Sequence, residues 1–212
     1  MKEVTLTTMQ MAREEREELA ALLAELSPQQ WDQPTLCDRW RVRDVVAHVI
    51  SYDELNRLGL IRRFAEGRLV VDRINAIGVA DYATRPPEEL CELMRTHTEP
   101  HGLPAGFGGM IALVDGMIHQ QDIRRPLKIP RTIPAERLRA VLDFARYAPL
   151  VRGAWRARGL RLAATDLDWS HGNGPEVRGS GEALLMAMAG RRDALDDLSG
   201  PGQPKLAQHI RG

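Results

Sequence analysis

Apolar residues recur at helical spacing through most of the first 158 residues of the chain. Residues 8–26 place apolar side chains beside a stripe of alternating charges, which is typical of a helix that packs on a core and faces solvent. The same spacing predicts helices at 42–66, 87–99, 110–126 and 135–158, the last one interrupted near Pro149. Residues 68–85 carry a weaker pattern that suggests a short helix across the bundle.

The pattern changes after Leu160. Residues 160–169 indicate a strand or a strand pair, Glu176–Arg178 a short strand, and Gly181–Arg191 an apolar helix. We therefore expect a mainly α protein, with a helical bundle in residues 1–158 and a small α/β domain in residues 159–212. A domain of about fifty residues is near the lower size limit, so we expect it to pack on the bundle.

Composition excludes several classes of partner. The 212 residues include 29 basic and 29 acidic side chains, so the formal net charge of +0 offers no general attraction to nucleic acid or to an anionic membrane. No apolar run approaches the roughly 20 residues that cross a bilayer, and the first twenty residues lack the apolar segment of a secretory signal. Two cysteines, Cys37 and Cys91, lack metal spacing and form no disulfide framework, which favours a reducing cytoplasm.

Candidate chemistry lies in the segment Val114–Leu127, VDGMIHQQDIRRPL, which reads as the last turns of a helix ending at Pro126. Asp115 and His119 are four residues apart and share a helical face, with Asp122 at its edge. A catalytic zinc site usually has three protein ligands, and His48 on an earlier predicted helix is the candidate third. The same spacing also fits an ordinary core or surface histidine, so spacing alone leaves both interpretations open.

Other polar residues near these positions have competing interpretations. Asp44 is four residues before His48, so it could orient a metal-bound imidazole or only stabilise the start of the helix. Cys37 could be a reactive thiol, but a structural role is favoured because no base lies within local reach. His97 and His101 are also four apart, but Pro100 between them disrupts the helical geometry, so we treat both as non-ligands.

Three motifs carry a family resemblance. The pattern W-x-x-P-T-x-C-x-x-W-x-V-x-D-V-x-A-H from Trp31 to His48, the segment HQQDIRRPL from His119, and residues 165–191 resemble the DinB-like metal-binding superfamily. Within it, the chain is most similar to the actinobacterial family of mycothiol-dependent maleylpyruvate isomerases. The resemblance implies a DinB-like four-helix bundle followed by a small C-terminal domain, and a divalent metal held by His48, Asp115 and His119.

The resemblance also implies a function. Mixed nitrogen and oxygen ligands suit zinc, with nickel or iron fitting almost as well. Mycothiol would be the thiol cosubstrate, and a C-terminal arginine, best matched by Arg191, would hold the acid group of a small electrophile. The expected activity is that of a thiol S-transferase or isomerase, in a monomer or homodimer without nucleic-acid or membrane partners. The better-studied branch has glutamate at the position of Asp115, so the alternative is a non-catalytic metal- or ligand-binding stress-response protein.

Overall fold

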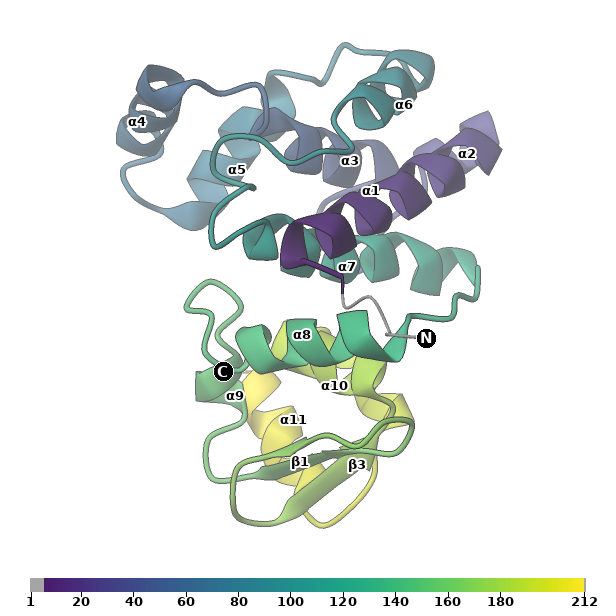
Figure 1. Cartoon of the computed structure of the whole chain (residues 1–212), viewed down its shortest axis with the longest axis vertical. Helices are drawn as coiled ribbons and strands as arrows, with labels where there is room; N and C mark the ends of the chain where they lie inside the picture. The colour runs from purple at the N-terminus through teal and green to yellow at the C-terminus, as the bar shows by residue number, and fades with distance from the viewer. Residues whose placement is uncertain (1–5, 212) are drawn as a thin grey trace. The chain divides into compact units, whose positions relative to one another are not determined.

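The computed structural model describes residues 6–211, which divide into two compact units between Pro130 and Arg131 (Figure 1). The first residues of the segment inspected for a secretory signal lie outside this described range. The helices of the first unit are α1 (Thr8–Glu25), α2 (Pro28–Trp31), α3 (Val42–Ser51), α4 (Arg57–Glu66), α5 (Val71–Ala80), α6 (Pro87–Thr96) and α7 (Met110–Leu127).

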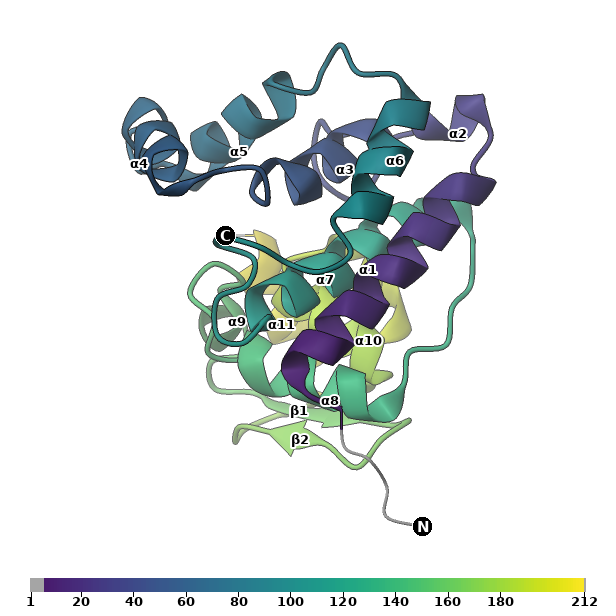
Figure 2. The ribbon, with the colours of Figure 1, turned by 45° about the horizontal axis from the view of Figure 1, so that its top comes forward.

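Four of these helices form a bundle: α1 contacts α6 and α7, and α3 contacts the same two helices. Helix α1 lies along α7 in both ribbon views (Figures 1 and 2). A Cβ at Gly116 of α7 would lie only 3.3 Å from the Glu15 side chain of α1, so glycine permits this close packing. The core is made of fully buried apolar side chains, including Leu19, Leu23, Val45, Ile50, Leu90, Met94, Leu113, Met117 and Ile123.

The single helix predicted over residues 42–66 is wrong, because the chain breaks between Ser51 and Arg57. Asn56 begins α4 by accepting a hydrogen bond from the backbone of Gly59 with its side chain. Asp53 turns inward in the break and forms a bidentate ion pair with Arg16 of α1. The hydrogen bonds of Asp53 and Asn56 therefore interrupt the helix although the apolar spacing continues.

The second unit combines short helices with a small sheet. Its elements are α8 (Ala135–Ala145), α9 (Gly153–Arg156), β1 (Arg161–Ala164), β2 (Ser170–His171), β3 (Glu176–Gly179), α10 (Gly181–Met188), the 3-10 helix η1 (Arg192–Asp197) and α11 (Gln203–Arg211). The strand order is β2-β1-β3, with β1 antiparallel to β2 and parallel to β3. Neither η1 nor α11 was predicted from the sequence.

The two units separate earlier in the chain than the expected boundary at residue 158. Helix α8 packs on α10, where a Cβ at Gly181 would lie 2.9 Å from Leu138 and 3.2 Å from Leu142. Helical spacing reveals an apolar face but not the element that covers it, so α8 could not be assigned to its unit from the sequence.

The expected fold class, mainly α with a small α/β part, is confirmed by this architecture. Over residues 6–211, no helix combines the length and the apolar character needed to cross a membrane.

Candidate metal centre

Helix α3 supplies His48, a residue buried within the bundle at 5% exposure. Arg41 caps the start of the helix, and its backbone N–H donates to the Asp44 carboxylate at 2.9 Å. Asp44 also pairs with the Arg41 guanidinium, so it stabilises the helix start. It does not orient His48, because the buried Nδ1 of His48 has no hydrogen-bond partner among the described residues.

Helix α7 supplies Asp115 and His119, one turn apart on the face that meets α3. The Nε2 atom of His48 lies 3.5 Å from Asp115 Oδ1, and the Nε2 atom of His119 lies 3.4 Å from the same oxygen. The three possible ligand atoms all lie within 4.8 Å of one another. The structure therefore brings His48, Asp115 and His119 together at one point.

The spacing of these atoms fits a shared metal ion better than it fits hydrogen bonds. Hydrogen bonds between nitrogen and oxygen usually measure about 2.7–3.2 Å. Two ligand atoms bound at 2.0–2.2 Å to a tetrahedral ion are separated by about 3.3–3.6 Å. The distances of 3.4 and 3.5 Å to Asp115 fall in the second range. Two imidazoles and a carboxylate are also a suitable donor set for a divalent transition metal.

Electrostatics distinguish the two histidines. Burial lowers the pKa of His48, and the attraction of the nearby Asp115 carboxylate only partly opposes this effect. Burial also opposes charge on Asp115 and His119, but their mutual attraction outweighs it. The pKa of Asp115 is therefore lowered and that of His119 raised. His48 is accordingly a neutral ligand candidate, whereas a metal reaching His119 must displace a proton.

Behind His119 lies a second polar group, Asp122, whose role the sequence pattern did not predict. Asp122 is completely buried, and its Oδ2 lies 3.0 Å from His119 Nδ1 and 3.0 Å from the thiol sulfur of Cys37. The i, i+3 spacing of His119 and Asp122 was the only local signal of this contact. No base lies near Cys37 in the sequence, as expected, but the fold brings Asp122 and His119 into contact with it.

Aromatic rings flank the histidines. The Trp40 ring centroid lies 5.0 Å from that of His48 and 6.2 Å from that of His119, and Tyr52 meets His48 edge-on at 5.7 Å. The Tyr52 hydroxyl donates to Asn75 at 2.6 Å, and burial raises its pKa to about 12. Tyr52 therefore stays neutral near neutral pH, and the rings give the centre an apolar wall.

The remaining candidates lie outside this group. His97 bonds to the Leu93 carbonyl, and His101 contributes its backbone N–H to Asp53. Neither belongs to a metal-type cluster within residues 6–211. Arg191 directly precedes η1 in the second unit and donates to the Ala189 carbonyl at 3.3 Å.

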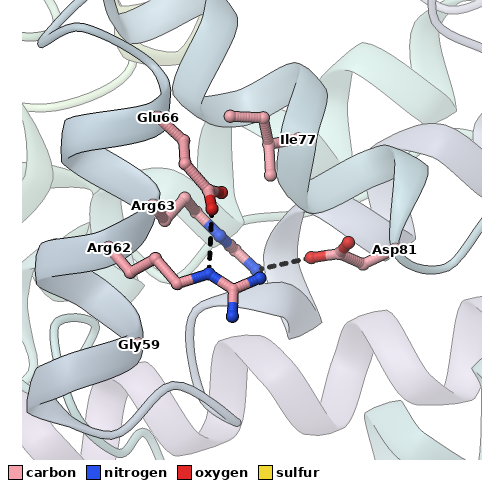
Figure 3. A pocket seen from close by; sticks show the side chains of 6 residues that line it. All are labelled: Gly59, Arg62, Arg63, Glu66, Ile77 and Asp81. Carbon is pink, nitrogen blue, oxygen red and sulfur yellow. Dashed lines mark hydrogen bonds and ion pairs between the residues drawn. The ribbon is translucent and has the colours of Figure 1, made fainter.

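A small polar pocket of about 80 Å³ lies between α4 and α5 (Figure 3). The buried guanidinium of Arg63 crosses it, donating to Ser51 Oγ at 3.0 Å and pairing with Asp81 at 3.3 Å. Arg62 pairs with Glu66 on its rim at 2.9 Å. Arg62 and Arg63 are each paired with a carboxylate of the pocket wall. The bond from Arg63 to Ser51 supports the end of α3, so we assign these side chains a structural role.

Comparisons with known proteins relate this architecture to one family. The model of the mycothiol maleylpyruvate isomerase N-terminal domain matches residues 12–100. Residues 12–100 belong to that domain family. The resemblance expected from the sequence is therefore confirmed, over a segment that contains His48 and ends before Asp115.

Solved structures extend the likeness of fold to most of the chain. A crystal structure of the mycothiol-dependent maleylpyruvate isomerase has a TM-score of 0.63 at 16% identity, with 92% of each chain covered. A histidine-to-alanine mutant of that isomerase gives 0.62 at the same identity and coverage. At this identity the match shows a shared fold. Among curated protein sequences, none matches this chain significantly.

Proposed function

We propose that the protein is a metal-dependent enzyme that joins a mycothiol-type thiol to a small electrophile, as a transferase or as an isomerase that later expels the thiol. The single observation that carries this proposal is the convergence of two imidazoles on one carboxylate oxygen at 3.4 and 3.5 Å. The family of residues 12–100 and the fold of the solved relative support the thiol chemistry, because both are named for mycothiol-dependent isomerisation.

His48, Asp115 and His119 would hold the metal, with zinc favoured by the mixed nitrogen and oxygen donors. A bound divalent ion would supply an open coordination position and stabilise a substrate thiol in its thiolate form. Three protein ligands are the usual number in a catalytic zinc site, since a fourth would close it.

Neighbouring residues of the bundle set the protonation and orientation of the two histidines. Burial lowers the pKa of His48 and so favours its neutral imidazole, and Asp122 accepts a hydrogen bond from Nδ1–H of His119, so that Nε2 of His119 faces Asp115. Trp40 and Tyr52 cover the histidines with apolar rings. The Asp115 side chain is 36% exposed, compared with 7% for His48, so solvent and substrate would approach from the Asp115 side.

Arg191 is proposed, from the family resemblance, to orient a carboxylate of the electrophile. A guanidinium can bind a carboxylate through two parallel hydrogen bonds, which would fix the substrate's direction. Arg191→Ala should therefore weaken turnover while leaving the metal content unchanged.

The test begins with metal analysis of the purified protein and of His48→Ala, with His101→Ala as the control. His101 is an exposed histidine outside the cluster. We expect one divalent metal ion per chain, most often zinc, in the wild type and in His101→Ala, and little or none in His48→Ala. Equal metal content in all three would refute the proposed ligand set.

Catalysis is then tested by giving metal-loaded protein mycothiol and a panel of electrophiles that includes maleylpyruvate. We expect metal-dependent thiol consumption or isomerisation with at least one of them. Stoichiometric metal without any turnover across the panel would contradict the enzyme and favour metal or ligand binding alone.

A further inference from the structure

The connector between α2 and α3 is built against the helix that carries His119. The backbone N–H of Leu36 donates to the carbonyl oxygen of Asp122 in α7 at 3.1 Å. That carbonyl is available because Pro126, four residues later, has no N–H with which to close the helical hydrogen bond. α7 continues past Pro126 to Leu127, and the free Asp122 carbonyl binds the connector.

The connector is held in shape by its own hydrogen bonds. Thr35 accepts the backbone N–H of Cys37 at 3.2 Å, and its hydroxyl donates to the Trp40 carbonyl at 2.9 Å. Pro34 and Arg41 form an isolated antiparallel bridge across the base of the turn. Cys37 is therefore presented by an ordered turn fastened to α7.

The polar contacts at this point have a defined direction. An ionised Asp122 can only accept, so both the Cys37 thiol and the Nδ1–H of His119 donate to its Oδ2, each at 3.0 Å. With its proton on Nδ1, the neutral imidazole of His119 has its lone pair on Nε2, the atom 3.4 Å from Asp115. Of the two neutral forms of His119, the hydrogen bonds of Cys37 and His119 to Asp122 therefore favour the one whose Nε2 can bind a metal.

We infer that Cys37 is a positioning residue, which holds the buried Asp122 carboxylate so that it orients His119 for metal binding. This inference rests on the proposed metal centre described above. It adds a reason for a cysteine at position 37: a small side chain that donates one hydrogen bond beside a buried carboxylate.

A second metal held by Cys37, Asp122 and His119 Nδ1 is the competing explanation, since these ligand atoms also lie within 4.8 Å of one another. Two of the three separations argue against it. The contacts of Asp122 with His119 and with Cys37 are both 3.0 Å, whereas a tetrahedral zinc ion would separate nitrogen and oxygen ligands by about 3.3–3.6 Å and sulfur and oxygen ligands by about 3.5–3.7 Å. The separation of 3.6 Å between Cys37 Sγ and His119 Nδ1 does not distinguish the two explanations.

The experiment measures zinc affinity by competition with a chromogenic chelator in the wild type, Cys37→Ala, Cys37→Ser and Asp122→Asn. Cys91→Ala controls for loss of a cysteine, because Cys91 lies in α6 outside both clusters. We expect about 10-fold weaker binding in Cys37→Ala and about 10–100-fold in Asp122→Asn, as for other partners of metal-bound histidines. Cys37→Ser should restore affinity, because its hydroxyl also donates, and Cys91→Ala should match the wild type.

Cobalt substitution supplies a readout that general destabilisation would not change. The wild type should bind one cobalt ion without a thiolate-to-cobalt charge-transfer band, and Cys37→Ala should alter the visible spectrum of the bound ion. Such a band, two ions per chain, or unchanged affinity in Cys37→Ala would overturn the inference while leaving the metal centre intact. A wild type that binds neither zinc nor cobalt would instead refute the proposed function together with this inference.

Discussion

Asp53→Asn should strongly destabilise the first unit, because it breaks a buried ion pair at the junction of three segments. Asp53 and Arg16 are 0% and 2% exposed, and two 2.9 Å hydrogen bonds join them. Arg16 also donates to the His97 carbonyl at 2.7 Å, and Asp53 accepts the backbone N–H of His101 at 2.9 Å. The pair thus connects α1, the end of α3 and the segment that leads into α7.

The magnitude follows from what the substitution leaves behind. Asparagine keeps nearly the same shape but removes the charge, so the Arg16 guanidinium stays buried without its counter-ion. Breaking one side of such a pair typically costs about 3–5 kcal/mol, well above the cost of losing one neutral hydrogen bond. Asp32→Asn is the matched control, because Asp32 is 52% exposed in its pair with Arg41 and should cost at most about 1 kcal/mol.

The assay is urea unfolding followed by tryptophan fluorescence, since Trp31 and Trp40 lie in the first unit. Replacing both partners, as Arg16→Met with Asp53→Leu, should cost less than the sum of the single changes, because no unpaired charge remains. A free energy of unfolding for Asp53→Asn within about 1 kcal/mol of the wild type would refute this reasoning.

Three further predictions follow from single contacts. Gly78→Ala should lower the free energy of unfolding by about 1–3 kcal/mol in urea titration, because its Cβ would lie 2.6 Å from Ser51 Oγ and 2.7 Å from Arg63 Nη1; wild-type stability would contradict this. Burial, and then Arg146, lower the pKa of His171, so its contribution to stability should be complete above about pH 6.5 and decrease as the pH falls toward the folded-state pKa. Proton NMR should place that pKa below 6.5, and a higher value would be contrary evidence. Zinc at about 100 times its dissociation constant should stabilise the wild type by about 2.7 kcal/mol but not His119→Ala, as measured by thermal unfolding; equal shifts would place the metal elsewhere.

The sequence predicted the bundle because burial imposes a 3.6-residue spacing that survives along α1, α3 and α7. It did not predict the break after α3, because the residues that cause it are polar and their partners are distant. Asp53 turns inward toward Arg16, 37 residues away, and local spacing carries no information about such a partner. The position of α8 was missed for the same reason, since its apolar face is covered by α10.

In the candidate site, too, the contact within one helix could be predicted from the sequence, whereas contacts between distant segments could not. One helical turn places Asp115 beside His119, which the spacing predicts. His48 was a candidate third ligand because a catalytic zinc site usually has three, and the family resemblance implied the same residue. Cys37 was expected to be a structural thiol and Asp122 had no predicted role, because their contact depends on the packing of the connector against α7. The sequence predicts that a helix ends at Pro126. It does not show that this proline also frees the Asp122 carbonyl to which the connector binds.

The aspartate at position 115 can be evaluated from the geometry. A side chain one methylene shorter than glutamate reaches a shared ion only if the two helices approach closely, and α3 and α7 are in contact. Asp115 Oδ1 lies almost equally far from the two Nε2 atoms, at 3.5 and 3.4 Å, rather than collapsing onto one of them as a hydrogen bond. The shorter carboxylate is therefore compatible with a metal-binding role, and the affinity measurements on this chain test that role directly.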